Sequence, residues 1–423
     1  MQYEPLKEVR EQPVHYTSQH PPLYYVILAP FLAPFLEDGD WKRAMLTGRI
    51  INIAIGVLLG AALAWAGWEF GGRRRYLFVI SVPFIGLMAL VVARASGDVV
   101  NDILGMLWVV LALTLTYRLV RDGVDTRSLL LLSAVLALGM STRASFIATF
   151  GISLVAVAAS IFIHENKKDL AVKSLRVIQA SLYLIVPALL AVGWFYWRNY
   201  QASGSWARSG PQSWISDIRP YKSLLEVLTS PDLYKAPKQM FHAGRLWYIS
   251  AVSFLAGVFV LIPVVVRNFK KSKKITGAVV FLTAVYVLLV YGMQIEHAVG
   301  YGQFSARYFL PLLMPISVVV VYGLAYFEKL KGMAIVAFVG LSLAGFIAGT
   351  KNFLETKVNP SLYKDLGYID TFREASVQNG VPFVAVVVCT ILCLIGFVLV
   401  AISLYKVSSR NISQPYRKIL QHR

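Results

Sequence analysis

Polar and charged side chains stand where long apolar stretches of the chain begin or end. Asp98, Asn101 and Asp102 precede the apolar stretch 103–117, and Arg143 lies in the short sequence MSTRAS between two apolar runs. A carboxylate can take a proton from an attacking hydroxyl group, and a guanidinium can hold a phosphate through paired charge-assisted hydrogen bonds. These residues are therefore the first candidates for chemistry.

Each candidate also has a purely structural explanation. Asp98 or Asn101 could accept hydrogen bonds from free backbone amides at the start of a helix over 103–117, as N-cap residues do. Arg143, like Arg307 in the sequence SARYFLP, could extend its side chain from a helix end to the lipid headgroups. From the sequence both explanations stay open, and the capping and binding roles do not exclude each other.

Composition sets the class of protein in which these residues must work. The 423 residues are 57% hydrophobic and 15% charged, which excludes an ordinary soluble domain. A helix needs about 20 mainly apolar residues to cross a hydrocarbon core of about 30 Å, and the chain offers such runs repeatedly. The sequence predicts an all-α polytopic membrane protein, with 1–423 as a single integral membrane domain.

We expect about eleven transmembrane helices and one short interfacial helix. The short helix covers 23–36, contains Pro30 and Pro34, and is too short to cross the bilayer. The predicted spans are 44–67, 77–93, 103–117, 129–140, 144–163, 177–197, 246–266, 275–293, 308–326, 332–349 and 381–404.

The segments between the predicted spans alternate in basic charge. One set holds 22 Lys and Arg in 64 residues, and the other holds 18 in 148. Because basic residues collect in cytoplasmic loops, the dense set is predicted to be cytoplasmic and includes the tail 405–423. The N-terminal segment 1–43 and the long loops 198–245 and 350–380 are then outside. This distribution accounts for the net charge of +19 without a nucleic-acid partner.

Several stretches resemble, in order, a family of membrane glycosyltransferases. They are HPPLYYVILAP, ASGDVVNDILGMLWVVLAL, LALGMSTRASFIATFGISL, GWFYWRNYQASGSW and GQFSARYFLPLLMPISVVVVYGL. From about residue 15 to about residue 326 the chain looks like the GT-C superfamily, which includes protein mannosyltransferases and aminoarabinose transferases.

The resemblance implies transfer of a sugar from a polyprenyl-phosphate-linked donor to a glycan, lipid or protein acceptor. The protein would lie in the cytoplasmic (plasma) membrane with its active site on the outer face. Family members begin with a spanning helix, followed by an acidic residue that acts as catalytic base. No such helix stands before the HPPLYY motif, so we expect that the chain lacks its first transmembrane helix.

By the same resemblance, the first outer loop supplies the base. The residues assigned to catalysis are Glu11 and Asp102, and those assigned to substrate binding are His20, Tyr24, Asp98, Asn101, Arg143, Arg307 and Tyr308.

No cofactor is expected beyond the lipid-linked sugar donor itself. His15, His20, Glu296 and His297 lack the spacing of a ligand set, so the sequence predicts no metal site. Two other functions remain open. The chain could be a non-catalytic member that binds lipid carriers within a glycan assembly complex, or a transporter of lipid-linked or small polar substrates.

Overall fold

The computed structural model describes the larger part of the chain. The described residues are 20–165, 169–204, 206, 223–233, 255, 257–259, 262, 274–301, 306–326, 339–340, 342–345, 347–348, 351, 360–378 and 381–420. Within these ranges every regular element is a helix, and no strand occurs. The predicted all-α class is therefore confirmed.

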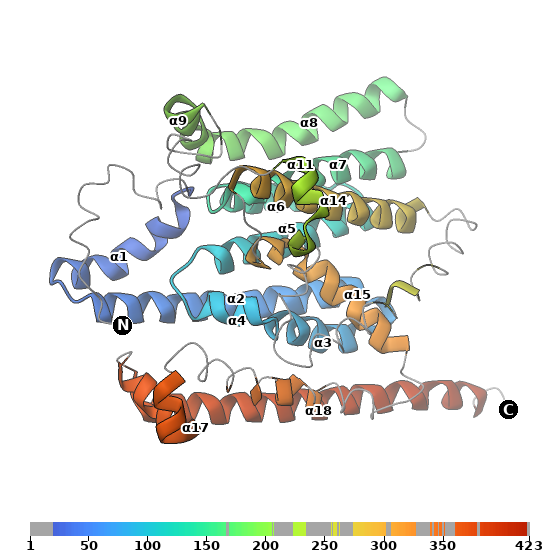
Figure 1. The fold of residues 1–423 in the computed structure, drawn as a ribbon. Helices are drawn as coiled ribbons and strands as arrows, with labels where there is room; N and C mark the ends of the chain where they lie inside the picture. Colours follow the sequence, from blue (N-terminus) through green and yellow to red (C-terminus); the bar gives the residue numbers. More distant parts are fainter. Residues whose placement is uncertain are drawn as a thin grey trace.

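The long helices lie side by side along one common direction (Figure 1). Short 3₁₀ segments at Gly72–Arg74, Ala144–Phe146 and Ala306–Leu312 and one π-helical segment at Leu189–Gly193 connect or extend them. The α-helices are α1 Leu23–Glu37, α2 Trp41–Gly71, α3 Arg75–Leu87, α4 Leu90–Ser96, α5 Asp102–Asp122, α6 Thr126–Met140, α7 Ile147–His164, α8 Leu170–Ala188, α9 Trp194–Ser203, α11 Leu224–Thr229, α14 Lys274–Tyr301, α15 Leu313–Tyr326, α17 Pro360–Gln378 and α18 Phe383–Leu420.

Seven helical stretches of the described chain are long and apolar enough to cross a membrane. They are Trp41–Leu87, Asp102–Asp122, Ala144–His164, Leu170–Ala202, Lys274–Val299, Arg307–Leu324 and Phe383–Val407. The structure therefore does not confirm the predicted count of about eleven transmembrane helices. Most of the predicted spans 246–266 and 332–349 lies outside the described residues.

The first of these stretches, of 47 residues, contains two helices that fold back on each other. A Cβ atom added to Gly67 of α2 would lie 2.4 Å from the carbonyl oxygen of Phe78 in α3. One added to Gly86 of α3 would lie 2.7 Å from a methyl group of Leu63 in α2. Since 67 pairs with 78 and 63 pairs with 86, α2 and α3 run antiparallel in close contact.

Two predicted spans differ from the observed helices. The span 77–93 is wrong as one helix, because α3 ends at Leu87 and a tight turn at Met88 and Ala89 leads into α4. The span 129–140 corresponds to α6, which has 15 residues. At about 1.5 Å per residue α6 is shorter than the apolar core of a bilayer. The predicted helix 23–36 is present as α1, also of 15 residues.

Hydrogen bonds tie the helix ends together at both ends of the bundle. At one end, the Tyr322 hydroxyl of α15 donates to the carbonyl of Phe70 in α2. At the other end, the Tyr196 hydroxyl of α9 donates to the carbonyl of Met140 in α6. The first end gathers the described parts of loops predicted to be cytoplasmic, and the second gathers those predicted to be outside.

The close approach of α2 and α3 yields a first prediction. Gly67→Ala should destabilise the protein by about 1–3 kcal/mol, because the new methyl group meets backbone that cannot move aside. Gly151→Ala in α7 is the matched control, since a Cβ atom there meets no atom within 4 Å. Thermal unfolding in detergent should show a lower midpoint for the first variant only. Equal midpoints would contradict the tight contact.

Candidate functional site

A buried ion pair joins two of the residues singled out from the sequence. Asp102 is the first residue of α5, and Arg143 lies in the turn between α6 and the segment Ala144–Phe146. Nη1 of Arg143 donates to Oδ1 of Asp102, and the two side chains are 12% and 4% exposed. Since a charge in apolar surroundings is costly alone, each of these residues stabilises the other.

The path of the Arg143 side chain depends on a glycine in α5. A Cβ atom added to Gly105 would lie 2.9 Å from Cδ of Arg143, so a larger residue would push the side chain away from Asp102. The guanidinium also faces an aromatic ring, with its central carbon 5.8 Å from the ring centroid of Tyr308. Arg143 also lines the cavity described below.

Tyr308 brings a second arginine to the same place. Nη2 of Arg307 donates to the Tyr308 hydroxyl at 3.3 Å, and its guanidinium lies 5.1 Å from the Tyr308 ring centroid. The ring of His297 packs edge-on against that of Tyr308, with 4.5 Å between the ring centroids. The side-chain amide of Gln294 donates to the backbone carbonyl of Tyr308 at 3.2 Å. The Arg307 side chain itself is exposed.

His20 completes this group, which we call the Asp102 cluster: His20, Asp102, Arg143, Arg307 and Tyr308. Burial, and then the positive charge of Arg143, lower the pKa of His20 from 6.5 to about 4, while Asp102 opposes this shift. Arg307 also lowers this pKa. His20 precedes α1 and lies outside the candidate spans. At neutral pH its imidazole is therefore neutral and able to accept a hydrogen bond.

A small cavity, partly open to solvent, lies against the cluster. Its polar lining includes Asp102, Arg143, Arg307 and Ser145, and Phe146, Leu310 and Pro311 contribute apolar walls. The two arginines outnumber the one carboxylate, so the cavity favours an anion. A ligand that carries both an anionic group and an apolar part matches this lining.

The other predicted site residues lie elsewhere or outside the described chain. Asp98 is exposed, and its carboxylate accepts from the amide of Val99 at 2.8 Å. The Tyr24 hydroxyl donates to Asn52 at 3.1 Å and to no side chain of the cluster. Glu11 lies outside the described residues.

The N-cap alternative for the start of α5 is wrong for Asn101. Asn101 stands at the N-cap position of α5 but makes no capping bond with its side chain. Its amide instead donates to the carbonyl of Thr142 at 3.2 Å. Asn101 therefore holds the turn that carries Arg143 against the start of α5.

A metal site finds no support in the part of the chain that the structure describes. There, no three His, Cys, Asp or Glu residues form a group that could hold an ion. In the Asp102 cluster the two arginines would also repel a cation. The chemistry available to these side chains is binding of an anion and exchange of protons.

The sequence reasoning missed Asn52, whose side chain is fully buried in α2. It also missed Ser145 and Gly105, which contribute to the cavity lining. A lone amide in an otherwise apolar stretch was the one signal that could have identified Asn52. The roles of Ser145 and Gly105 depend on the path of Arg143, which has no signature in the sequence.

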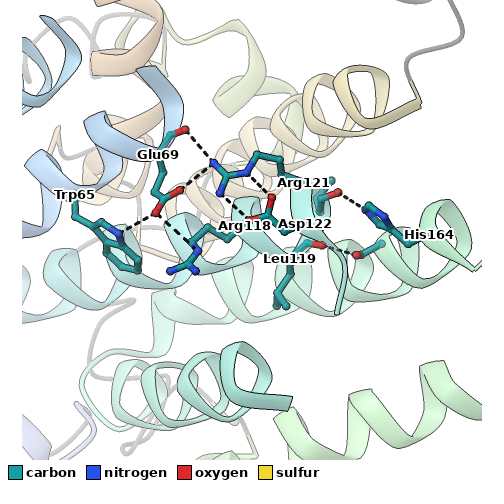
Figure 2. A network of polar contacts seen from close by, with 9 residues as sticks. Trp65, Glu69, Arg118, Leu119, Arg121, Asp122 and His164 are labelled. Atoms are coloured by element: carbon teal, nitrogen blue, oxygen red, sulfur yellow. Dashed lines mark hydrogen bonds and ion pairs between the residues drawn. The ribbon is translucent and has the colours of Figure 1, made fainter. Parts of the chain in front are cut away.

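A second polar group lies at the opposite end of the bundle. Figure 2 shows this group, which we call the Glu69 network: Trp65, Glu69, Arg118, Arg121, Asp122 and His164. Nη1 of Arg121 in α5 lies 2.9 Å from Oε2 of Glu69 in α2, and Nε1 of Trp65 donates to Oε1 of Glu69 at 3.2 Å. Nε2 of His164 in α7 donates to the carbonyl of Val120 at 3.1 Å. The network therefore joins the ends of α2, α5 and α7.

The comparisons with known proteins return nothing that bears on these sites. No family model, no curated protein and no solved structure matches the chain.

The neutral His20 yields a prediction about pH. Between about pH 6.5 and about pH 4 the unfolded chain binds a proton at this residue that the folded protein does not, so stability should fall as pH is lowered through this window. His20→Gln removes the group. The thermal midpoint of the wild type should drop more than that of the variant between about pH 7 and about pH 5. Parallel curves would contradict the buried neutral imidazole.

The Asp102–Arg143 pair yields a prediction about stability. Asp102→Asn should cost about 3–5 kcal/mol, because it leaves the Arg143 charge buried without its partner. The double variant Asp102→Leu with Arg143→Met should cost less than the single variant. Denaturant unfolding in detergent measures both.

The matched control for this pair is Asp40→Asn. Asp40 pairs with Arg43 at 3.3 Å with exposed fractions of 35% and 74%, so its loss should cost at most about 1 kcal/mol. Asparagine also keeps the N-cap of α2. Equal losses for Asp40→Asn and Asp102→Asn would show that the Asp102 pair is not specially protected from solvent.

Proposed function

We propose that the chain binds the phosphate of a lipid-linked sugar at the Asp102 cluster. The observation that carries this proposal is the convergence of Arg143 and Arg307, which are far apart in sequence, on one partly apolar cavity. A guanidinium binds phosphate through directional charge-assisted hydrogen bonds. The apolar wall formed by Leu310 and Pro311 suits the first part of an isoprenoid chain.

With the family resemblance, the same geometry supports sugar transfer of the GT-C type. In that reaction the acceptor hydroxyl attacks the anomeric carbon, and the bond to the donor phosphate breaks. The hydroxyl proton goes to a carboxylate, and the phosphate departs with the bonding electrons and gains negative charge. Arg143 and Arg307 would stabilise that growing charge. Ser145 and the neutral His20 would orient the donor or the acceptor.

Glu11 remains the proposed base, as a residue of the first outer loop. We assign Asp102 a different role, because its carboxylate already accepts from Arg143. In this role Asp102 orients the guanidinium toward the phosphate. Three further residues, Asp98, Asn101 and Tyr24, then do not contact the phosphate. They hold the segments that lead into α5 and α1 in place.

The same pair favours one second candidate, a non-catalytic protein that binds the lipid carrier. Among the described residues of the cluster, the sole carboxylate is that of Asp102, and it is already paired. Such a protein would bind polyprenyl phosphate without transferring sugar.

We further propose that the cluster faces the outer side of the plasma membrane and that the C-terminus is cytoplasmic. Arg73, Arg74 and Arg75 follow α2 at the end of the bundle that holds the Glu69 network. Basic residues near helix ends favour the cytoplasmic side. The Asp102 cluster at the other end would then meet substrates outside the cell.

Arg307 provides the test of this function. Arg307→Ala should lower sugar transfer from a polyprenyl-phosphate donor by about 30- to 1,000-fold, which corresponds to about 2–4 kcal/mol of transition-state stabilisation. Arg307→Lys should lose much of the rate too, because an ammonium cannot form the paired hydrogen bonds. The measurement is transfer by the full chain in lipid nanodiscs, with polyprenyl-phosphate binding recorded in parallel.

Arg43→Ala is the matched control for this experiment. Arg43 is an exposed arginine at the start of α2, paired only weakly with Asp40, and lies outside the cluster. Its loss should leave transfer and binding unchanged. Normal transfer by both Arg307 variants would refute the phosphate contact. Tight binding with no transfer by the wild type would favour the non-catalytic candidate.

A further inference from the structure

Asn52 is a buried amide in the first half of α2, a mainly apolar helix. Its side chain is 0% exposed, and Ile50, Ile51 and Ile53 surround it in sequence. Placing an amide in apolar surroundings is costly unless its hydrogen bonds are made. Its polar groups must therefore have partners within the protein.

Those partners come from two other segments. Oδ1 of Asn52 accepts from the Tyr24 hydroxyl of α1 at 3.1 Å. Nδ2 donates to the carbonyl of Val100 at 3.0 Å and also faces the carbonyls of Ala95 and Asp98. The amide thus bridges α1 and the connecting segment, residues 97–101, which joins α4 to α5.

Two glycines allow this segment to lie directly on α2. Gly48 and Gly56 stand four residues before and after Asn52, on the same helical face. A Cβ atom at Gly48 would lie 2.8 Å from Cγ2 of Val99, and one at Gly56 would lie 3.0 Å from Oγ of Ser96. The chain therefore approaches α2 closely on both sides of the amide.

From the connecting segment, hydrogen bonds lead to the Asp102 cluster. Asn101 donates to the carbonyl of Thr142, the residue before Arg143, and Asp102 follows Asn101 directly. On the other arm, the amide of Leu23 donates to the carbonyl of Ser141 at 3.0 Å. That arm holds the start of α1, which follows His20, against the turn that carries Arg143.

We infer that Asn52 is a positioning residue of the Asp102 cluster: its hydrogen bonds go to none of the cluster's side chains but fix the two backbone segments that carry Asp102 and His20. The inference deepens the proposed function and rests on it for the choice of ligand. The loss of Asn52 should release the start of α5 and weaken phosphate binding while most of the bundle stays folded.

Hydrogen exchange and ligand binding together test the inference. In nanodiscs, Asn52→Leu should raise amide exchange in peptides that cover residues 97–105 by about 10-fold or more, because the hydrogen bond from the Gly105 amide to the Asn101 carbonyl depends on this segment. Binding of polyprenyl phosphate should weaken by about 10-fold. Tyr24→Phe, a milder change, should raise exchange at the start of α1 and leave the peptides over 97–105 nearly as in the wild type.

Ser133→Ala is the matched control. Ser133 is 3% exposed and donates to the carbonyl of Tyr183 at 2.6 Å, so its loss also removes a buried bond between helices. It lies outside the connecting segment and should change neither exchange over 97–105 nor binding.

The outcomes separate this inference from the proposed function. Unchanged exchange over 97–105 in Asn52→Leu overturns the positioning role, whatever the ligand result. Equal exchange and binding changes in Ser133→Ala overturn it as well, because they indicate general loosening. Failure of the wild type to bind polyprenyl phosphate overturns the proposed function. The exchange over 97–105 in Asn52→Leu then decides by itself whether Asn52 has the positioning role. If Asn52→Leu does not fold, Tyr24→Phe provides the test. Unchanged exchange at the start of α1 in that variant overturns the role of Asn52 in holding α1.

Discussion

The candidate site depends on one interaction, the ion pair between Asp102 and Arg143. A helix that begins in or near the membrane cannot carry a buried charge without a partner. By accepting from Arg143, the carboxylate of Asp102 allows a guanidinium to sit at the wall of a partly apolar cavity. Three other features depend on this pair or hold it together. Gly105 leaves room for the Arg143 side chain, the ring of Tyr308 faces its guanidinium, and Asn101 holds the turn before Arg143 against the start of α5.

The bundle separates its polar groups into two sets at opposite ends of the helices. The Glu69 network ties the ends of α2, α5 and α7, whereas the cluster end leaves a cavity beside its charges. This difference suits two tasks. One end is held together by groups that pair with one another, and at the other end two arginines line a cavity.

Several parts of this arrangement could be predicted from the sequence, because they depend on composition and local pattern. Apolar runs identified most helices, and charged residues at their ends identified Asp102, Arg143 and Arg307. The break at Met88 and Ala89 could not be predicted, because the residues on either side are uniformly apolar and the turn is set by the packing of α4 on α2.

The long-range contacts were equally beyond the sequence. The pairing of Asp102 with Arg143, 41 residues away, follows from how α5 and α6 pack. The role of Asn101 differs for the same reason, since its side chain donates to a carbonyl in the turn before Arg143 and does not accept from the free amides of α5. Local propensity describes the start of a helix well, but a tertiary partner decides where its side chain points.

The most direct test of the account is a structure of the full chain in nanodiscs with polyprenyl phosphate bound, determined by electron cryo-microscopy. The account predicts the phosphate in the cavity, within about 2.7–2.9 Å of guanidinium nitrogens of Arg143 and Arg307. It also predicts that the Asp102–Arg143 bond is retained and that the isoprenoid chain runs along Leu310 and Pro311. A phosphate bound away from both arginines, or a cavity filled by another part of the chain, would contradict it.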